Sequence, residues 1–330
     1  MSKRELLARL LYQSGVGGVL RHWGGWNGLL VLNYHRVGDW ASSPWDKDLY
    51  SASAEDFDAQ MRFFKSEFDV IGSADLPDIQ NRRGRYVQVT FDDGYRDNHD
   101  VAFPILKSHG LTATFFVCTG FLDHGGVPWW DELAWIIRRA PEDELPAFRG
   151  FPTMSLKHGG RLHAIRALND AFDVMSDAKR IGFLDELADV TQTGRCPPEE
   201  GQHLWMTWDM AREMHRNGMT IGGHTLNHVE LSRLSKAEQL EEVKGSCNRI
   251  EAELGTPVTI FSYPYGTKRS FDANTRLALA EAGIRYGYSY NGGFQKTGAW
   301  DNYNIKRIAV ETSVSVALLK GMATLPQLLA

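Results

Sequence analysis

Residues 86–95 of this 330-residue chain read YVQVTFDDGY, an apolar run that ends in two acidic residues and a glycine. A short apolar and β-branched run closed by a turn signal predicts a buried strand, with Asp92 and Asp93 at its end. A second short strand is expected at residues 220–223, directly before the histidines of HTLNH at 224–228. Functional side chains of a strand-and-helix barrel gather at the carboxyl ends of its strands. We therefore expect the two motifs to meet.

The residue types in these two motifs are those of a metal site. Two adjacent carboxylates and two histidines four residues apart can bind one divalent ion and leave one acid over to handle a proton. Imidazole and carboxylate ligands suit zinc and its first-row neighbours, and three protein ligands leave room for a water molecule. Asp-Asp-Gly alone is usually a turn, and two spaced histidines alone are a weak signal. Together, at the ends of two strands, they predict a metal site.

At these residues the chain resembles the polysaccharide deacetylase family, also called the NodB-homology family. TFDDG at 90–94 is similar to its first motif, HTLNH at 224–228 to its second, and FSYPYG at 261–266 to its third. The resemblance extends from about residue 29 to residue 310. It implies a metal-dependent hydrolase that removes an N-acyl group, in the first place N-acetyl, from an amino sugar in a glycan or glycan precursor. One divalent ion is implied, with zinc preferred and cobalt or nickel as alternatives.

The resemblance also implies a role for individual residues. Asp92 would be the general base, and Asp93, His224 and His228 would hold the metal ion. The backbone N–H of Tyr265 would face the oxyanion of the tetrahedral intermediate, a task that such donors perform in acyl transfer generally.

The third motif departs from the family pattern at Ser262. Many members carry an arginine at this position, two residues before the proline, where it orients the general base. Arg307 is a candidate replacement as the partner of Asp92. A surface arginine at a strand end is the alternative.

The general acid is the second departure. Many members carry a histidine for this task near the C-terminus, but this chain has no histidine after His228. His35 follows GLLVLNY at 28–34, which reads as a buried strand. This arrangement resembles a subgroup of exopolysaccharide deacetylases whose barrel is circularly permuted, so that the acid-bearing strand comes first. We therefore predict His35 as the general acid, with a buried structural histidine as the alternative.

Strands and helices alternate along most of the chain, which favours an α/β fold with a parallel sheet, here a distorted (β/α) barrel of about seven strands. Residues 1–27 are expected to form an N-terminal helical segment and residues 28–330 the barrel. A helical insertion is expected at about 123–201. Its three helix patterns lie at 131–139, 161–174 and 176–190, with no clear strand among them.

Aromatic residues near this insertion are candidates for a sugar-binding surface, because tryptophan presents a flat apolar face with a polar edge. The candidates are Trp129, Trp130, Trp205 and Trp208. Trp130 and Asp131 are preferred, since similar tryptophan-containing segments occur in the resembling subgroup. Tyr263 and Pro264 of the third motif are predicted as further substrate contacts. The alternative is that these side chains pack the insertion onto the barrel.

Amino-acid composition limits which binding partners and which cellular compartment we expect for the protein. A net charge of −5 offers no basic field for nucleic acid. Three widely spaced cysteines suggest no disulfide framework and fit a reducing compartment. The first residues lack the features of a secretory signal, so a cytoplasmic enzyme is expected, acting on a lipid-linked or nucleotide-linked sugar.

Leucines at helical spacing in residues 3–20 allow two interpretations. The segment could pack on the barrel, or it could form an amphipathic helix in peripheral contact with the inner membrane face.

Two other functions remain open. The same metal site could hydrolyse a non-sugar amide. The missing arginine and C-terminal histidine also allow a catalytically degenerate carbohydrate-binding protein.

Overall fold

The structure is a computed structural model and describes residues 3–22, 25–172, 175, 177–298 and 300–330. The chain divides into two compact units. The barrel unit comprises Met1–Gly38, Asp48–His124 and Trp205–Ala330, and the insert unit comprises Asp39–Lys47 and Gly125–Leu204. The helical insertion expected at about 123–201 falls almost wholly within the insert unit. The short segment Asp39–Lys47, far away in sequence, belongs to the same unit.

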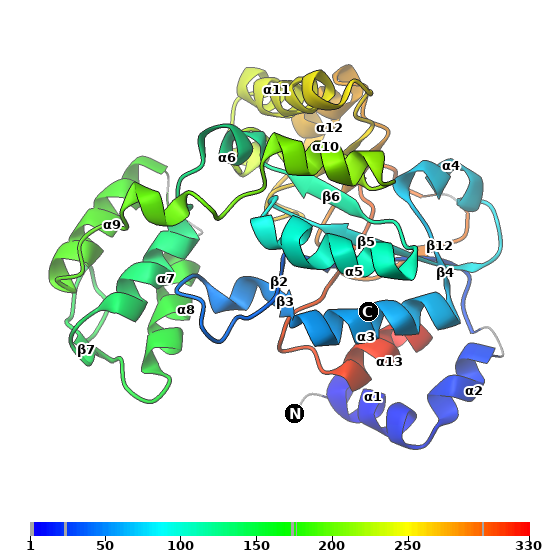
Figure 1. Cartoon of the computed structure of the whole chain (residues 1–330), viewed down its shortest axis with the longest axis horizontal. Helices are drawn as coiled ribbons and strands as arrows, with labels where there is room; N and C mark the ends of the chain where they lie inside the picture. Colours follow the sequence, from blue (N-terminus) through cyan, green and yellow to red (C-terminus); the bar gives the residue numbers. More distant parts are fainter. Residues whose placement is uncertain (1–2, 23–24, 173–174, 176, 299) are drawn as a thin grey trace. The chain divides into compact units, whose positions relative to one another are not determined.

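Seven strands of the barrel unit form a curled parallel sheet with helices packed outside it (Figure 1). They are β1 (Gly28–Tyr34), β5 (Arg85–Phe91), β6 (Thr114–Val117), β9 (Thr220–Gly223), β10 (Ile260–Ser262), β11 (Tyr286–Tyr288) and β13 (Ile308–Ala309). Neighbours follow the order β11, β10, β9, β6, β5, β1. Closure arises because β13 pairs with β1, and Ile305 forms a parallel bridge with Tyr288 of β11. The predicted distorted barrel of about seven strands is confirmed.

Three short pairings complete the strands of the barrel unit. β4 (Asp69–Val70) lies parallel to β5, and β12 (Gln295–Lys296) lies antiparallel to β1. Directly after β1, β2 (Arg36–Val37) pairs with β3 (Tyr50–Ala52) in a separate two-stranded sheet.

Side chains of the barrel strands alternate between two cores, as the pleat of a strand requires. On β1, Leu29 and Val31 belong to the cluster inside the barrel, whereas Leu30 and Leu32 belong to the cluster beneath the helices. Every residue of β1 is buried, which is typical of a parallel strand covered on both faces.

Helices of the barrel unit cover the outside of the sheet. They are α1 (Lys3–Gln13), α2 (Val16–His22), α3 (Ala54–Glu67), α4 (Leu76–Ile79), α5 (Phe103–His109), α6 (Thr119–His124), α10 (Trp208–Arg216), α11 (Lys236–Leu254), α12 (Ala273–Glu281), α13 (Val316–Thr324) and α14 (Pro326–Leu329). Serine residues cap the first turns of α3 and α11: the Oγ atoms of Ser53 and Ser235 accept from the backbone N–H three residues on. None of the described helices combines the length and the apolar content that crossing a membrane requires.

The insert unit is built from three helices around an aromatic core. They are α7 (Trp129–Arg139), α8 (Gly160–Phe172) and α9 (Asp177–Val190). The ring of Phe183 packs edge-on against Phe172 and Phe148, with ring centroids 4.6 and 5.2 Å apart. A small antiparallel pair, β7 (Glu144–Leu145) with β8 (Met154–Ser155), also forms here, although the sequence indicated no strand in this segment.

Candidate active site

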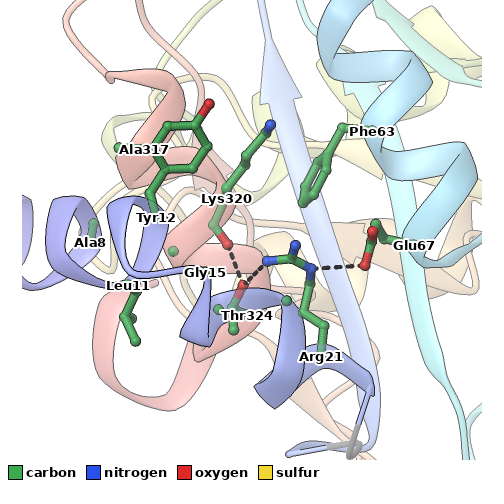
Figure 2. A pocket seen from close by; sticks show the side chains of 13 residues that line it. Ala8, Leu11, Tyr12, Gly15, Arg21, Phe63, Glu67, Ala317, Lys320 and Thr324 are labelled. Carbon is green, nitrogen blue, oxygen red and sulfur yellow. Dashed lines mark hydrogen bonds and ion pairs between the residues drawn. The ribbon is translucent and has the colours of Figure 1, made fainter.

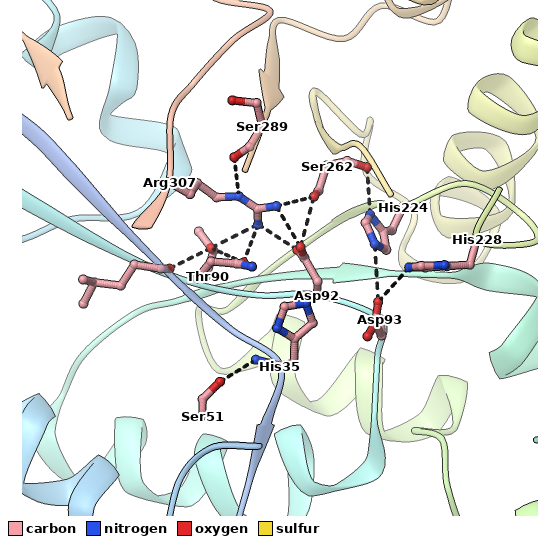
Figure 3. Close-up of polar contacts among 12 residues, drawn as sticks. His35, Ser51, Thr90, Asp92, Asp93, His224, His228, Ser262, Ser289 and Arg307 are labelled. Atoms are coloured by element: carbon pink, nitrogen blue, oxygen red, sulfur yellow. Dashed lines mark hydrogen bonds and ion pairs between the residues drawn. The ribbon is translucent and has the colours of Figure 1, made fainter. Parts of the chain in front are cut away.

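Five polar side chains reach the carboxyl end of the barrel from different strands (Figure 3). They are His35, Asp92, His224, Ser262 and Arg307. Their placement follows from register and alternation. Tyr34 lies opposite Phe91 in the pairing of β1 with β5, and the next residue of each strand, His35 or Asp92, takes the inward side. The backbone N–H of Asp92 donates to the carbonyl of Tyr34 at 3.0 Å, which holds the two strand ends together.

Asp93 would point away from Asp92 if the strand continued, but its backbone has a φ of 76°. This left-handed conformation turns the Asp93 carboxylate toward the histidines of the second motif. Among the described residues, four of the seven non-glycine positions with positive φ belong to the three motifs; they are Asp93, Thr225, His228 and Tyr265. Strained backbone of this kind is typical of functional sites, where the surrounding fold holds it in place.

Asp93, His224 and His228 form a buried cluster of potential metal ligands. Asp93 Oδ1 lies 3.4 Å from His224 Nε2 and 3.3 Å from His228 Nε2. One ligand atom from each of the three residues lies within 4.8 Å of the other two. These residue types are ligands of zinc and neighbouring first-row metals.

A hydrogen bond on the far side of the His224 ring shows that this cluster fits a cation. His224 Nδ1 lies 2.8 Å from the carbonyl oxygen of Ser262, which can only accept, so Nδ1 carries the proton. In the neutral ring, Nε2 then presents a lone pair toward Asp93 Oδ1. Two acceptors facing each other in a buried site repel unless a positive charge lies between them, either a metal ion or a proton on the ring. The orientation of the ring is the one that metal-binding histidines commonly adopt.

The charge on Asp93 also suits a ligand. Burial raises the pKa of Asp93, but its interactions with His224 and His228 outweigh burial and leave the pKa well below its usual value. The carboxylate is therefore ionised at neutral pH.

Asp92 is held mainly by Arg307, which lies outside the third motif, with a longer hydrogen bond of 3.3 Å from Ser262 Oγ of that motif. The Arg307 guanidinium donates to both carboxylate oxygens, from Nη1 to Oδ1 at 2.8 Å and from Nη2 to Oδ2 at 2.7 Å. Nη2 also donates to Ser262 Oγ at 2.8 Å. The Arg307 side chain is 1% exposed, so the alternative of a surface arginine is wrong.

Every N–H of this guanidinium has an acceptor. Nε donates to the carbonyl of Ser289 at 3.1 Å, and Nη1 donates to Asn33 Oδ1 at 2.5 Å in addition to Asp92. Burial raises the pKa of Asp92, but the charges of Arg307 and His224 and the Arg307 hydrogen bonds hold it below its usual value. Asp92 is thus an oriented carboxylate in its ionised form.

His35 is fixed through its backbone and leaves its ring available. Its N–H donates to Ser51 Oγ at 3.0 Å, and its carbonyl accepts from Asn98 Nδ2 at 2.7 Å. The ring points toward Asp92 (Figure 3) and lies edge-on to Tyr290, with centroids 6.4 Å apart. Neither ring nitrogen is hydrogen-bonded to another described residue, so both can interact with solvent or a substrate.

The backbone of the third motif is held on both sides of Tyr265. Gly266 N donates to the carbonyl of Pro264, and the carbonyl of Gly266 accepts from Tyr290 N, both at 2.7 Å. The Tyr265 ring lies 5.5 Å from the His228 ring, measured between centroids. The third motif therefore borders the metal-ligand cluster.

Comparison with known proteins identifies this arrangement. The family model for polysaccharide deacetylases matches residues 79–143 and 186–287, which together make up half of the chain. The chain belongs to the polysaccharide deacetylase family. The matched segments contain both aspartates, both histidines of the second motif and the third motif, but neither His35 nor Arg307.

Individual relatives agree with this assignment. YxkH of Bacillus subtilis (strain 168), provisionally named as a polysaccharide deacetylase, is 23% identical over 201 residues, which cover 61% of this chain and 43% of YxkH. The chain thus spans less than half the length of that relative. The Streptococcus pyogenes deacetylase PplD, solved with acetate, superimposes with a TM-score of 0.58 at 19% identity, over 89% of this chain and 98% of PplD. IcaB from Ammonifex degensii gives 0.56 at 19% identity, over 89% and 97%. These structures share the deacetylase fold.

The predicted substrate contacts of the third motif do not fit their role. Tyr263 is 1% exposed, its hydroxyl donates to the carbonyl of Tyr303 at 2.9 Å, and its ring stacks on Phe271 with centroids 4.1 Å apart. This prediction is wrong because Tyr263 points outward from the barrel into the core beneath the helices. Pro264 is buried as well.

The predicted contacts of the insertion are also core residues. Asp131 is fully buried and accepts from the backbone N–H of Asp46 at 2.9 Å within the insert unit, so its prediction as a substrate contact is wrong. Trp130 is 8% exposed and packs edge-on against Trp129. In the barrel unit, Trp205 is sandwiched between Tyr95 and Phe121. The tryptophans contribute to packing because large aromatic rings fill cores as readily as they form binding surfaces.

Several site residues were not predicted from sequence. Asn33 and Ser289 hold Arg307, while Ser51 and Asn98 hold His35. Tyr290 lies next to His35 directly after β11. Asn33 had a detectable signal, since it is the one strongly polar residue in the apolar strand 28–34. Ser51 lies in β3, Asn98 begins a short π-helix, and Ser289 and Tyr290 follow β11, so no local pattern in the sequence connects them to the site.

The metal cluster makes a direct prediction. Replacing His224 or His228 by Ala removes one of three ligands, so each variant should lose bound zinc, cobalt or nickel and all activity. Metal content by mass spectrometry and binding by calorimetry measure the loss, with exposed His203→Ala as the matched control. Full metal occupancy in the double variant would show that the ion binds elsewhere.

The Arg307 pair predicts a shift in pH dependence. In Arg307→Met, burial of Asp92 is no longer opposed by the guanidinium, so the pKa of Asp92 should rise. A base must be deprotonated to act, and the acidic limb of the kcat/KM profile should therefore move to higher pH. The exposed Arg83→Met serves as the control. An unchanged acidic limb in folded Arg307→Met would contradict the pairing.

Proposed function

We propose that this chain is a metal-dependent carbohydrate deacetylase that removes an N-acyl group, in the first place N-acetyl, from an amino sugar in a glycan or glycan precursor. The observation that carries the proposal is that two adjacent aspartates have different partners and can perform different tasks. Asp93 faces two histidines, while Asp92 is held by a buried arginine. A metal-ligand cluster and a separate oriented base are the parts that hydrolysis of an amide requires.

Asp93, His224 and His228 would hold one divalent ion, with zinc preferred and cobalt or nickel as alternatives. Such an ion makes bound water acidic enough to act as a nucleophile near neutral pH.

Asp92 would accept the proton of the attacking water. Oδ2 already accepts from Arg307 and lies 3.3 Å from Ser262 Oγ, whereas Oδ1 accepts only from Arg307 among the described residues. We therefore assign the proton transfer to Oδ1. Arg307 fixes the plane of the carboxylate and keeps it ionised before the reaction, which a general base requires.

His35 would protonate the leaving amine. Imidazole has a pKa suited to proton transfer near neutrality, and the His35 ring is turned toward the same barrel mouth as Asp92. The backbone N–H of Tyr265 would donate to the oxyanion as the acyl carbon becomes tetrahedral.

The other two functions receive less support. A catalytically degenerate carbohydrate-binding protein would not need Arg307 to orient Asp92 through a guanidinium that is hydrogen-bonded at every N–H. It would also not need His35 beside Asp92 with a ring that makes no hydrogen bond to another described residue. Hydrolysis of a non-sugar amide would use the same site and differs only in substrate. We further propose a cytoplasmic enzyme that acts on a lipid-linked or nucleotide-linked sugar and contacts the inner membrane peripherally through residues 3–20.

Acetate release distinguishes these functions. Protein loaded with zinc, cobalt or nickel should release acetate from N-acetylated glycans or sugar precursors, and chelator-treated protein should not. Release from non-sugar amides alone would favour the second hydrolase function. Glycan binding without release under any metal would show a degenerate binder.

Asp92→Asn tests the base. The variant should keep the metal, because Asp92 is not a ligand, and lose roughly 10²- to 10⁴-fold in kcat, the range for a lost general base. Metal titration and steady-state kinetics measure both, with exposed Asp209→Asn as the control. Loss of metal in Asp92→Asn together with its retention in Asp93→Asn would exchange the two roles.

His35→Ala tests the acid. Substitution leaves the backbone hydrogen bonds to Ser51 and Asn98 possible, so the variant should fold and bind metal but lose most amide hydrolysis. An aryl acetate ester, whose leaving group needs no proton, should remain a substrate. The alkaline limb of the amide pH profile should vanish in the variant. Equal loss on ester and amide would indicate a structural role for His35.

A further inference from the structure

Large apolar side chains that are exposed to solvent concentrate on four helices of the barrel unit. Of the eleven exposed in the described chain, eight lie on α1, α2, α13 and α14. They are Leu6, Leu7, Leu10, Tyr12, Val16, Val19, Val316 and Leu328. Scattered single apolar residues are ordinary on a protein surface, but a concentration of this kind marks an interaction site.

Helix α1 is apolar on two sides. Its inner side packs on α13, where Ala8 is fully buried and a Cβ placed on Gly321 would meet Ala8 Cβ at 2.9 Å. Leu6 and Leu10 are four residues apart and share an outer side with Leu7. The two interpretations of this segment from sequence are thus compatible: α1 packs on the barrel unit and still presents leucines to solvent.

The charge of the same region has the opposite sign to that of the whole chain. Residues 1–22 and 315–330 contain five lysines and arginines and a single acid, Glu5, whereas the chain carries a net charge of −5. Apolar side chains beside basic ones are the pattern of helices that lie in the interface of a membrane with anionic lipids.

A cavity of about 250 Å³ opens between α1, α2, α3 and α13 (Figure 2). Lys320 projects into it between two aromatic rings, with Nζ 5.1 Å from the centroid of Tyr12 and 4.9 Å from that of Phe63. Among the described residues, the ammonium group has no hydrogen-bond or ion-pair partner. Arg21, at the same cavity, is occupied by Glu67 at 2.8 Å and Thr324 at 2.9 Å. Lys320 is therefore the cation available to an anionic ligand.

We propose that α1, α2, α13 and α14 form a docking surface for an anionic membrane. Lys320 binds the head group of a phospholipid with a net negative charge, and the outer leucines enter the acyl region. A second copy of this chain is the less suitable occupant, because a two-fold contact would set this basic surface against itself. The proposal deepens the peripheral membrane contact proposed above for residues 3–20, and its test does not depend on the deacetylase activity.

Vesicle sedimentation of the full chain tests the surface. The protein should bind phosphatidylglycerol vesicles, bind phosphatidylcholine vesicles weakly, and be released by salt. Leu10→Ser should lower binding about tenfold, as expected for the loss of one membrane-buried leucine. Lys320→Gln should lower binding to the anionic vesicles about fivefold and leave binding to neutral ones unchanged.

Two variants on α11 and α12 provide matched controls. Leu277 is 55% exposed, close to the 56% of Leu10, and Lys236 is an exposed lysine. Leu277→Ser and Lys236→Gln should bind vesicles like the unaltered protein, and all four variants should keep their activity on a soluble substrate. The proposal would be overturned if the unaltered protein did not bind anionic vesicles. It would also be overturned if the two control variants lost as much vesicle binding as Leu10→Ser and Lys320→Gln. So would a concentration-dependent dimer that Leu10→Ser dissociates, since it would show a second copy as the occupant.

Discussion

The site depends on one buried ion pair, that of Arg307 with Asp92. The segment that closes the barrel is short, and Arg307 within it is hydrogen-bonded to β1 through Asn33, to the end of β5 through Asp92, to β10 through Ser262 and to the residue after β11 through Ser289. A buried charge that lost its partner would destabilise the fold by about 3–5 kcal/mol. The closure of the barrel and the position of the base therefore rest on the same side chain.

Two neighbouring residues of one type acquire different tasks because the backbone separates them. Asp92 keeps the inward side of β5 and meets Arg307, while the positive φ of Asp93 turns the next carboxylate to the histidines. Burial disfavours both charges, and different partners compensate each of them: a guanidinium for Asp92 and two imidazoles for Asp93. Each carboxylate is thus ionised for a separate reason.

Sequence reasoning succeeded where local pattern and strand topology coincide. The apolar strand before Asp92 and the short strand before His224 predicted that both motifs reach one end of a barrel, and the structure brings them together. Sequence reasoning failed for Tyr263 and Asp131, which were predicted to contact substrate. The type of a residue does not show whether its aromatic ring or carboxylate lies in the core or in a cleft. Apart from Asp92, the partners of Arg307 could not be found locally, because Asn33, Ser262 and Ser289 lie in or directly after strands that become neighbours only on closure. The insert unit also contains Asp39–Lys47, and no local pattern in the sequence predicts that this segment belongs with residues 125–204.

Spatial order in the sheet, not order along the chain, assembles the catalytic groups. The family model covers the metal ligands and Asp92 but neither His35 nor Arg307, which lie near opposite ends of the chain. Since β1 pairs with β5 on one side and with β13 on the other, both residues nevertheless flank Asp92. The same two segments continue into the proposed docking surface: α2 precedes β1, and α13 follows β13. The groups outside the family model therefore lie at strands that are neighbours in sequence of helices in the proposed docking surface.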